Sequence, residues 1–203
     1  MLELYTAGTH NGIRANIALA ESGLGYHVHK LNLSAGDQRQ PAYTAINPAG
    51  RIPVLVDPHG PEGRTVLSQS GAIMIYVANK SGKLWPAGDA AKIAALQWLM
   101  FACSDVAGWN GFYQQSMTML PEKVDANIDY CKQRLQRWFG EADAQLGKTQ
   151  YLAGEVSLAD FAVFPVVNQR RALIEEAGLK NLSRWWNQVS SRAAVQKGLS
   201  EST

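Results

Sequence analysis

The dipeptide Ile52-Pro53 is the first candidate for a binding site in this chain. It lies within the run Asn47 to Leu55 (NPAGRIPVL). A cis peptide bond before Pro53 would turn the main chain of Ile52 outward, where it could pair with an extended peptide as an added strand does. A trans bond would leave an ordinary proline entering an edge strand, without such a dock. The motif therefore predicts a peptide-binding edge, on condition that the bond is cis.

The pair Gln69-Ser70 stands directly before an apolar helical pattern and is a second candidate site. The free N–H groups and the dipole at a helix N-terminus favour an anion such as a ligand carboxylate. The side chain of Gln69 or Ser70 could then add hydrogen bonds to that anion. The simpler interpretation is that Ser70 only caps the helix, and a capping serine can also take part in binding an anion.

The two cysteines, Cys103 and Cys131, offer little chemistry of their own. They form no CxxC motif and no Cys/His cluster, which argues against a disulfide framework, a structural zinc site or any other metal site. We expect two inert, buried thiols in a reducing compartment.

The elements that must position these residues begin with a βαβ unit followed by a ββα unit. Periodicity and turn residues predict strands at 2–6, 26–33, 54–56 and 65–67. A helix should follow the turn at 8–12 and end at Gly23, a helical turn should cover 42–46, and Ser70 should N-cap a helix ending at Gly82. Residues 57–60 and 62–63 are expected to be turns.

From Lys92 onward the strand signals disappear and apolar residues recur at helical spacing. One helix should continue past Trp109, Pro121 should open a second that runs toward Leu146, and a later one should end near Gly198. Between them, Ser157 and Asp160 have the spacing of a capping box, with Val156 and Phe161 placed as a hydrophobic staple.

The fold class is therefore α/β plus all-α. We expect an N-terminal domain at 1–83, a linker at 84–90 and an all-helical C-terminal domain at 91–203. The composition agrees, since six of eight prolines and eleven of eighteen glycines precede residue 90 whereas five of six tryptophans follow it.

Composition and charge exclude several classes of protein. Apolar residues make up 46% and charged residues 18%, which is too apolar for a disordered chain. The net charge of +2 is not concentrated in either half, so we expect neither nucleic acid nor membrane as a partner. The first residues lack the charged and apolar regions of a secretory signal, which indicates a soluble, cytoplasmic protein.

Four motifs in order carry a resemblance that covers essentially the whole chain: LYTAGTHNG at 4–12, NPAGRIPVL at 47–55, SQSGAIMIY at 68–76 and GEVSLADF at 154–161. Together they resemble the soluble glutathione transferase superfamily, which joins a thioredoxin-like domain to a helical bundle domain. The first turn and the run LNLSAGDQRQPAY at 31–43 look most like the bacterial Nu class, whose members bind glutathione or its disulfide and reduce disulfides.

The resemblance implies glutathione as cosubstrate, with a cis Pro53 and the main chain of Ile52 pairing with its backbone. It places the γ-glutamyl end at Gln69 and Ser70, and the glycyl end near Gln38 and Arg51. Most relatives carry Glu before the serine, so Gln69 removes one negative charge from this site.

The chemistry implied is thiol activation, because a free thiol has a pKa of about 8.5 and only the thiolate attacks well. By resemblance, Thr9 and Asn11 together stabilise the thiolate, and Tyr5 is the alternative donor because several animal classes have their catalytic tyrosine there. His10 stands where another bacterial class has a nucleophilic cysteine, so the reacting sulfur here is that of glutathione.

The second substrate, a small hydrophobic electrophile or a disulfide, is expected between the two halves. Its wall would be the turn at Thr9 and the first long helix of the second half, although aromatic residues at helical spacing are often simply core. The candidates on that helix are Phe101, Cys103, Asp105, Trp109 and Phe112. On the next helix, Tyr130 or Arg134 falls near the place of an arginine that reaches the ligand in some Nu-class relatives.

These motifs leave conjugation, disulfide reduction and peroxide reduction open as the reaction. A non-catalytic module that binds ligands or proteins on the transferase scaffold is the alternative function, and the polar residues at Thr9, Asn11, Gln38 and Ser70 disfavour it. Relatives form twofold dimers, so we expect a homodimer.

Overall fold

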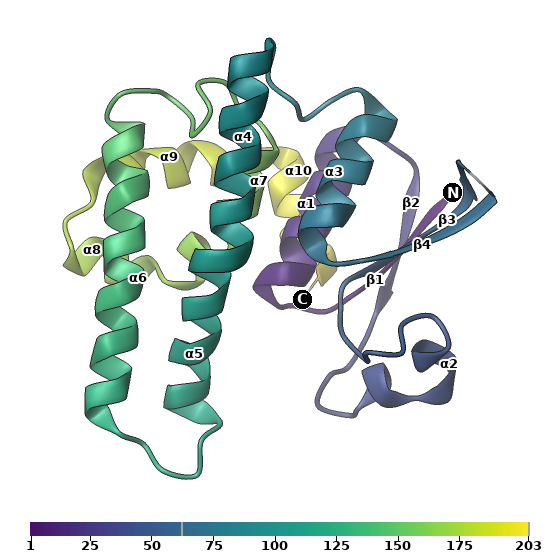
Figure 1. The fold of residues 1–203 in the computed structure, drawn as a ribbon, viewed down its shortest axis with the longest axis horizontal. Helices are drawn as coiled ribbons and strands as arrows, with labels where there is room; N and C mark the ends of the chain where they lie inside the picture. The colour runs from purple at the N-terminus through teal and green to yellow at the C-terminus, as the bar shows by residue number, and fades with distance from the viewer. Residues whose placement is uncertain (62, 203) are drawn as a thin grey trace. The chain divides into compact units, whose positions relative to one another are not determined.

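The computed structural model describes residues 1–61 and 63–202, which form two compact units (Figure 1). The first unit contains residues 1–85 together with the C-terminal residues from Ser191 onward, and the second contains Pro86–Ser190. Of the expected turns, the one that includes Glu62 lies partly outside the described residues.

The first unit is built on a four-stranded sheet with the order β2-β1-β3-β4. β1 (Leu2–Thr6) pairs parallel with β2 (Tyr26–Lys30) and antiparallel with β3 (Val54–Gly60), which pairs antiparallel with β4 (Gly63–Ser68). This is the predicted βαβ-ββα arrangement, and the thioredoxin-like domain is confirmed.

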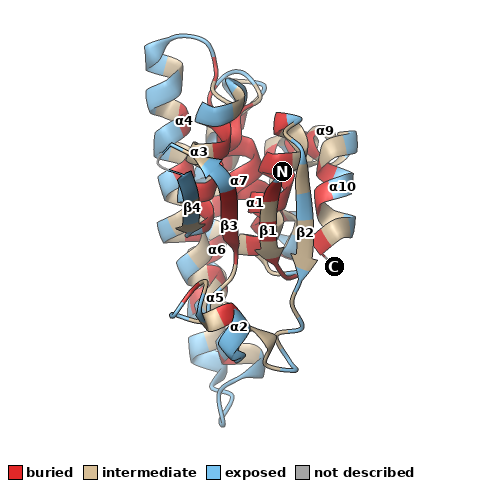
Figure 2. Cartoon of the chain, turned by 90° about the vertical axis from the view of Figure 1, so that its right-hand side faces the viewer, coloured by how far each residue is buried: buried red, intermediate tan, exposed pale blue. Residues whose placement is uncertain are grey.

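Two helices, α1 (His10–Ser22) and α3 (Ser70–Ser81), pack on one face of this sheet. Their apolar residues form a core with those strand residues that alternate toward the same side. The buried members of this core are Leu2, Leu4, Ala15, Leu19, Leu55, Ile73 and Val77. The strands lie in front of these helices in Figure 2.

The opposite face of the sheet carries a smaller core of Tyr43, Val54 and Val56. Tyr43 comes from α2 (Pro41–Thr44), which follows the short 3₁₀ turn η1 (Asp37–Arg39). α2 is shifted by one or two residues from the helical turn expected at 42–46. Pro41 explains the start, because proline is well suited to the first helical position.

The hairpin between β3 and β4 is longer than the sequence indicates. The residues 57–60 were expected to be a turn, and that prediction was wrong, since pairing continues through Asp57 with Thr65 and Gly60 with Gly63, with a register shift between them. Asp57 is buried there and accepts hydrogen bonds from Tyr76 Oη (2.5 Å) and Lys80 Nζ (2.8 Å). Burial raises the pKa of Asp57, but these bonds and the N–H of His59 outweigh it and lower the value to about 2.

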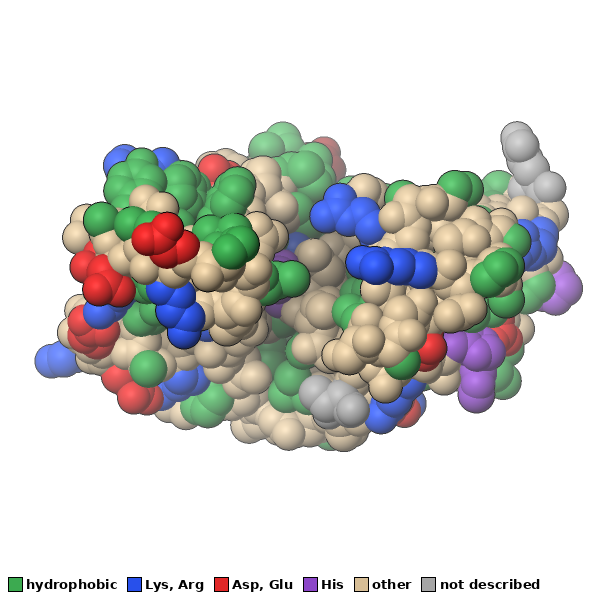
Figure 3. All heavy atoms as spheres, turned by 90° about the horizontal axis from the view of Figure 1, so that it is seen from below, with side chains coloured by type: hydrophobic (Ala, Val, Ile, Leu, Met, Phe, Trp, Pro, Cys, Tyr) green, Lys and Arg blue, Asp and Glu red, His purple; other side chains and the backbone are tan. Residues whose placement is uncertain are grey.

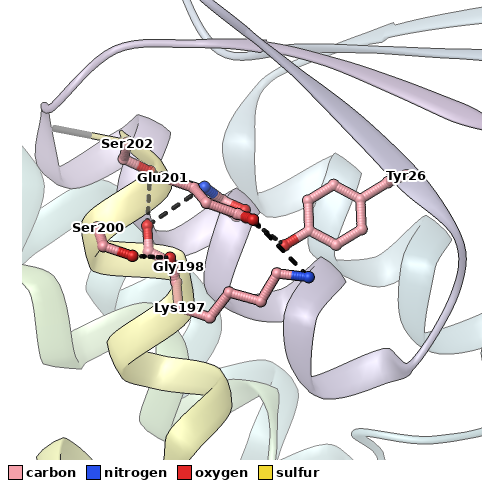
Figure 4. A network of polar contacts seen from close by, with 7 residues as sticks. Tyr26, Lys197, Gly198, Ser200, Glu201 and Ser202 are labelled. Atoms are coloured by element: carbon pink, nitrogen blue, oxygen red, sulfur yellow. Dashed lines mark hydrogen bonds and ion pairs between the residues drawn. The ribbon is translucent and has the colours of Figure 1, made fainter.

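The last helix, α10 (Ala193–Ser202), packs on α1 and β2 within the first unit. The expected C-terminal domain of 91–203 therefore extends too far, because its final helix belongs with the sheet. Asn16 Nδ2 on α1 donates to the carbonyl of Gly198 (3.2 Å) and to Ser202 Oγ (3.0 Å). Tyr26 donates to Glu201 (2.8 Å), as Figure 4 shows.

We expect Gly198→Ala to destabilise the protein, because a Cβ there would lie 2.8 Å from the main-chain nitrogen and 2.9 Å from the Cα of Ile17. α10 would have to move away from α1, at a cost of about 1–3 kcal/mol in unfolding free energy. Gly140→Ala is the matched control, since a Cβ at Gly140 meets nothing within 4 Å and alanine favours a helix by about 1 kcal/mol. Urea unfolding of both variants should show opposite signs, and equal effects would contradict this packing.

The second unit is helical throughout its described secondary structure, apart from two isolated bridges near Tyr151 to Glu155. α4 (Asp89–Phe101), the π-helical segment η2 (Ala102–Val106) and α5 (Ala107–Thr118) form one continuous stretch past Trp109, as predicted. The later helices are α6 (Asp125–Leu146), α7 (Leu158–Gln169), α8 (Arg171–Glu176) and α9 (Lys180–Ser190).

α6 begins at Asp125, so the prediction that Pro121 opens this helix was wrong. Val124 has extended main-chain angles, and the acidic side chain of Asp125 is well placed in a first helical turn. The stretch Asp89–Thr118 passes the length and composition test for crossing a membrane, alone among the described residues. Core helices of soluble proteins pass the same test.

The capping box at the start of α7 is confirmed. The Ser157 side chain accepts from the first turn of the helix, and Asp160 Oδ2 accepts from the Ser157 N–H (2.9 Å). Asp160 Oδ1 also accepts from Leu152 N–H (3.1 Å) and from Trp185 Nε1 (2.7 Å). The wholly buried carboxylate of Asp160 thus joins α7 to α9 and to the segment at Leu152 that precedes α7.

Candidate active site

The turn between β1 and α1 presents Thr9 as the N-cap of the helix. Thr9 Oγ1 accepts a hydrogen bond from the Gly12 N–H (3.2 Å), which leaves the hydroxyl proton of Thr9 to donate to another acceptor. Gly12 has no room for a side chain, since a Cβ would lie 2.2 Å from the Ala7 carbonyl oxygen. The tight turn therefore holds the Thr9 hydroxyl in one place.

Asn11 and Ser70 lie within hydrogen-bonding distance although 59 residues separate them in the chain. Ser70 Oγ donates to Asn11 Oδ1 (3.3 Å), and Ser70 is only 7% exposed. This bond joins the first turns of α1 and α3. Because the amide oxygen of Asn11 is engaged, its NH₂ group is left to donate to a ligand.

Gln69 is the N-cap of α3, and Ser70 is the first helical residue rather than the expected N-cap. Gln69 has φ 74° and ψ 115°, a conformation that costs a non-glycine residue about 1–3 kcal/mol and that is concentrated at functional sites. Its side chain makes no capping bond. The first N–H groups of α3 are consequently available for an anion.

The Ile52-Pro53 bond is cis, as the peptide-binding hypothesis requires. Ile52 precedes β3, so its main chain stands outside the ladder. The carbonyl of Arg51 accepts from Tyr43 Oη (2.6 Å) and Asn47 Nδ2 (2.7 Å), which holds this segment in place. The Arg51 side chain is exposed, and its guanidinium makes no bond to any described residue.

Gln38 carries a buried acceptor. Its Nε2 donates to the Leu33 carbonyl (3.3 Å), while its Oε1 is buried and has no hydrogen-bond partner among residues 1–61 and 63–202. A buried polar atom without a partner is costly and points to a ligand or water. An N–H group of a ligand would be a suitable partner for this acceptor.

Tyr5 lies on the sheet face that carries Tyr43, Val54 and Val56. Its ring stacks on His29 with 4.3 Å between centroids and lies 6.1 Å from that of Tyr43. These contacts give Tyr5 a packing role in its strand. His10 is the first residue of α1.

The candidates of the second unit lie on α4, η2 and α5 as expected. Phe101 packs edge-on against Trp98 and Trp138, while Trp109 contacts Phe112 and Tyr130. Cys103 and Asp105 belong to the π-helical segment, a type of irregularity common at functional sites. The remaining cysteine, Cys131, is buried as expected, whereas Cys103 is only half-buried, and no disulfide joins the two.

Of the two candidates on α6, Arg134 packs against aromatic rings and is more buried than Tyr130. Its guanidinium lies over the rings of Trp109 (5.0 Å) and Trp138 (5.3 Å), a cation–π arrangement. Its Nε and the Trp138 Nε1 are both buried without a hydrogen-bond partner among the described residues. Tyr130, by contrast, is 54% exposed.

A hollow lies beside Thr9 in the first unit. We call it the Thr9 hollow; its volume is about 540 Å³, and its lining consists of Ala7, Gly8, Thr9, Lys30, Leu31, Asn32, Leu33, Asp37 and Ser202. Three separate segments of the first unit meet there. The sequence alone gives no sign of it, because nothing in the helical pattern of α10 indicates that Ser202 returns to the first turn.

Residues 1–61 and 63–202 contain no group of three or more His, Cys, Asp or Glu side chains able to hold a metal ion. On the face that Figure 3 shows, acidic and basic side chains are mixed rather than gathered into one broad field of a single sign.

Comparison with known proteins agrees with this geometry. Residues 1–79 match the family model "Glutathione S-transferase, N-terminal domain", and residues 93–193 match "Glutathione S-transferase, C-terminal domain". The chain is 30% identical to the disulfide-bond oxidoreductase YfcG of Escherichia coli strain K12, over 98% of this chain and 94% of that protein.

Two solved structures are similar over 98% of this chain. A glutathione transferase from Burkholderia graminis, with two glutathione molecules bound per subunit, has a TM-score of 0.91, 31% identity and 87% coverage of its own chain. One from Pseudomonas putida, with one glutathione disulfide bound per subunit, has a TM-score of 0.88, 32% identity and 90% coverage. Both family models and these relatives agree, and the chain belongs to the glutathione S-transferase family.

Proposed function

We propose that this chain binds glutathione in its first unit and activates the thiol for attack on an electrophilic carbon or on sulfur. The Asn11–Ser70 hydrogen bond carries this proposal, because it places a free amide donor and a helix N-terminus side by side. One extended tripeptide could reach both, with its thiol near Asn11 and its γ-glutamyl carboxylate at Ser70.

The other site residues fit glutathione one group at a time. The main chain of Ile52, before Pro53, pairs with the cysteinyl backbone. The buried acceptor of Gln38 takes an N–H of the glycyl end, and the exposed guanidinium of Arg51 takes its carboxylate. Gln69 contacts the γ-glutamyl group without adding a negative charge beside its carboxylate.

Thiolate stabilisation is assigned to Thr9 and Asn11, with Tyr5 as the alternative donor. The Thr9 hydroxyl and the Asn11 amide both have a proton free to donate, and both lie at the N-terminus of α1, whose dipole favours negative charge. Lowering the thiol pKa by one unit needs about 1.4 kcal/mol, which one charge-assisted hydrogen bond can provide.

We propose disulfide reduction as the main reaction, alongside conjugation to small hydrophobic electrophiles and peroxide reduction. The thiolate of glutathione attacks one sulfur of the disulfide, forms a mixed disulfide and releases the other half as a thiolate. A second glutathione thiolate then attacks the mixed disulfide, giving glutathione disulfide and the second thiolate. The similarity to a disulfide-bond oxidoreductase and to a transferase holding glutathione disulfide supports this order of preference.

The functional form is proposed to be a cytoplasmic homodimer. α4 presents a row of exposed apolar side chains at helical spacing, Ile93 (68% exposed), Leu96 (41%) and Met100 (45%). A second copy of the chain would cover such a row through a twofold contact.

Calorimetry with glutathione, followed by parallel assays of conjugation, disulfide reduction and peroxide reduction, tests the proposal. We expect binding, with the highest activity on disulfides. Ser70→Ala should raise the Kd about tenfold, since it removes a bond to a charged group, while Ser81→Ala at the other end of α3 should leave the Kd unchanged. Absence of binding by the unmodified chain would favour a non-catalytic module, and binding without any of the three activities would refute the enzyme.

A further inference from the structure

We propose that the Thr9 hollow binds the charged end of the acceptor, so that the preferred disulfides are those carrying an amino-acid group, held by Lys30 and Asp37. This inference rests on the proposed function, because Thr9 is the residue assigned to the glutathione thiolate. The hollow begins at Thr9 and extends between the β2–η1 loop and the end of α10. An acceptor sulfur beside Thr9 would therefore place the rest of that molecule in the hollow.

One carboxylate oxygen of Asp37 accepts a hydrogen bond from the protein, and the other is available to a ligand. Its Oδ2 accepts from the Asn32 N–H (2.8 Å), and its own N–H donates to the Asn32 carbonyl (3.2 Å). Asn32 Oδ1 in turn accepts from the N–H groups of Ser34 and Ala35, both at 3.1 Å. The loop is thus braced from within, and Asp37 Oδ1 is available to an ammonium group.

Lys30 supplies the opposite charge. Its side chain is exposed, and its only polar contact within residues 1–61 and 63–202 is a 3.5 Å approach of Nζ to the Ser200 carbonyl. No carboxylate pairs with it among the described residues. The nearby Glu201 is engaged by Tyr26 and Lys197 (Figure 4). Within the part of the chain that the structure describes, the ammonium of Lys30 is therefore a cation without a counter-charge at the edge of the hollow.

α10 forms the third wall and is firmly held. Asn16 binds both Gly198 and Ser202, and Arg192 forms a two-bond ion pair with Glu21 (2.6 and 2.8 Å). The two charges thus stand on a braced loop and beside an anchored helix. Two opposite charges that line one hollow favour a zwitterion, which bears one carboxylate and one ammonium, over a neutral acceptor.

The transfer itself is the exchange described above and needs only glutathione as reductant. The bond formed joins the glutathione sulfur to one acceptor sulfur, and the bond broken is the acceptor disulfide. The proton taken up by the leaving thiolate comes from water. Lys30 and Asp37 position the acceptor and take no part in these bonds.

The test compares cystine, which is zwitterionic at both ends, with the neutral bis(2-hydroxyethyl) disulfide, using the full-length protein and subtracting the uncatalysed exchange. Lys30→Met should raise KM for cystine at least fivefold with kcat within twofold, and leave KM for the neutral disulfide within twofold. Lys30→Arg should restore most of the loss. Asp37→Asn, which keeps an acceptor for the Asn32 N–H, should also raise KM for cystine alone.

Lys83→Met is the matched control, because Lys83 is an exposed lysine of the same unit away from the hollow. This substitution should leave KM unchanged for both disulfides. Equal effects of Lys30→Met on both disulfides, or no effect on either, would overturn the inference while leaving the proposed function intact. Reduction of neither disulfide by the unmodified protein would instead refute the proposed function, and the inference with it.

Discussion

Replacing Asp160 by alanine is expected to lower the free energy of unfolding by about 4 kcal/mol. The carboxylate is wholly buried and accepts hydrogen bonds from the N–H groups of Ser157 and Leu152 and from Trp185 Nε1. Its removal leaves these three donors buried without an acceptor, at about 1–3 kcal/mol each before the structure relaxes. Loss of the capping box adds about 1 kcal/mol.

Urea unfolding of the full chain measures this effect. Asp129→Ala is the control, since Asp129 is exposed on α6 and its replacement should change the unfolding free energy by no more than about 0.5 kcal/mol. A loss below about 1 kcal/mol in Asp160→Ala would show that the buried bonds contribute little.

The pH dependence of stability reports on the same carboxyl. Burial raises the pKa of Asp160 to about 6, although hydrogen bonds from Trp185 Nε1 and from the N–H groups of Leu152, Ser157 and Asp160 itself oppose the rise. The folded protein then binds this proton more tightly than the unfolded chain, so the contribution to stability is greatest below pH about 4 and is lost as pH rises toward 6. Asp160→Asn should abolish this fall, and an identical pH profile in the variant would contradict the raised pKa.

Local patterns predicted the helix at Asp160 and the strands at Leu2 and Val54 because their signals are complete within a few residues. The capping box needs only Ser157 and Asp160, and strand alternation needs only neighbours. The sequence did not reveal that α10 returns to the sheet. Helical periodicity shows that a helix has an apolar face, whereas the partner of that face is decided by a close approach at Gly198.

In the candidate site, too, local motifs could be predicted from the sequence, whereas contacts between distant segments could not. Ile52, Pro53 and Gln69 could be chosen from a motif, and the cis bond and the unusual φ of Gln69 agree with that choice. The bond between Asn11 and Ser70 could not, because it joins two helix starts that only the sheet brings together. The charges of the Thr9 hollow were likewise invisible, since Lys30 and Asp37 gain their setting from α10 and from the bracing at Asn32.

The second large effect is expected at the thiol. Asn11→Ala combined with Thr9→Val should raise the pKa of bound glutathione's thiol by about one unit or more and lower kcat/KM for disulfides about 10- to 100-fold. The reason is that both donors at the start of α1 are removed while its dipole remains. Titration of the thiolate absorbance in the binary complex measures the pKa directly.

Asn11→Asp separates donation by the amide from its structural bond to Ser70. A carboxylate oxygen still accepts from Ser70 Oγ, so the link between α1 and α3 is kept, but the amide donor is replaced by a negative charge beside the thiolate. The thiol pKa should therefore rise more in Asn11→Asp than in Asn11→Ala, with glutathione still bound. Tyr5→Phe keeps the ring stacked on His29 and should leave the pKa unchanged. The opposite pattern, a shift in Tyr5→Phe with none in the Asn11 variants, would transfer the activating role to the tyrosine.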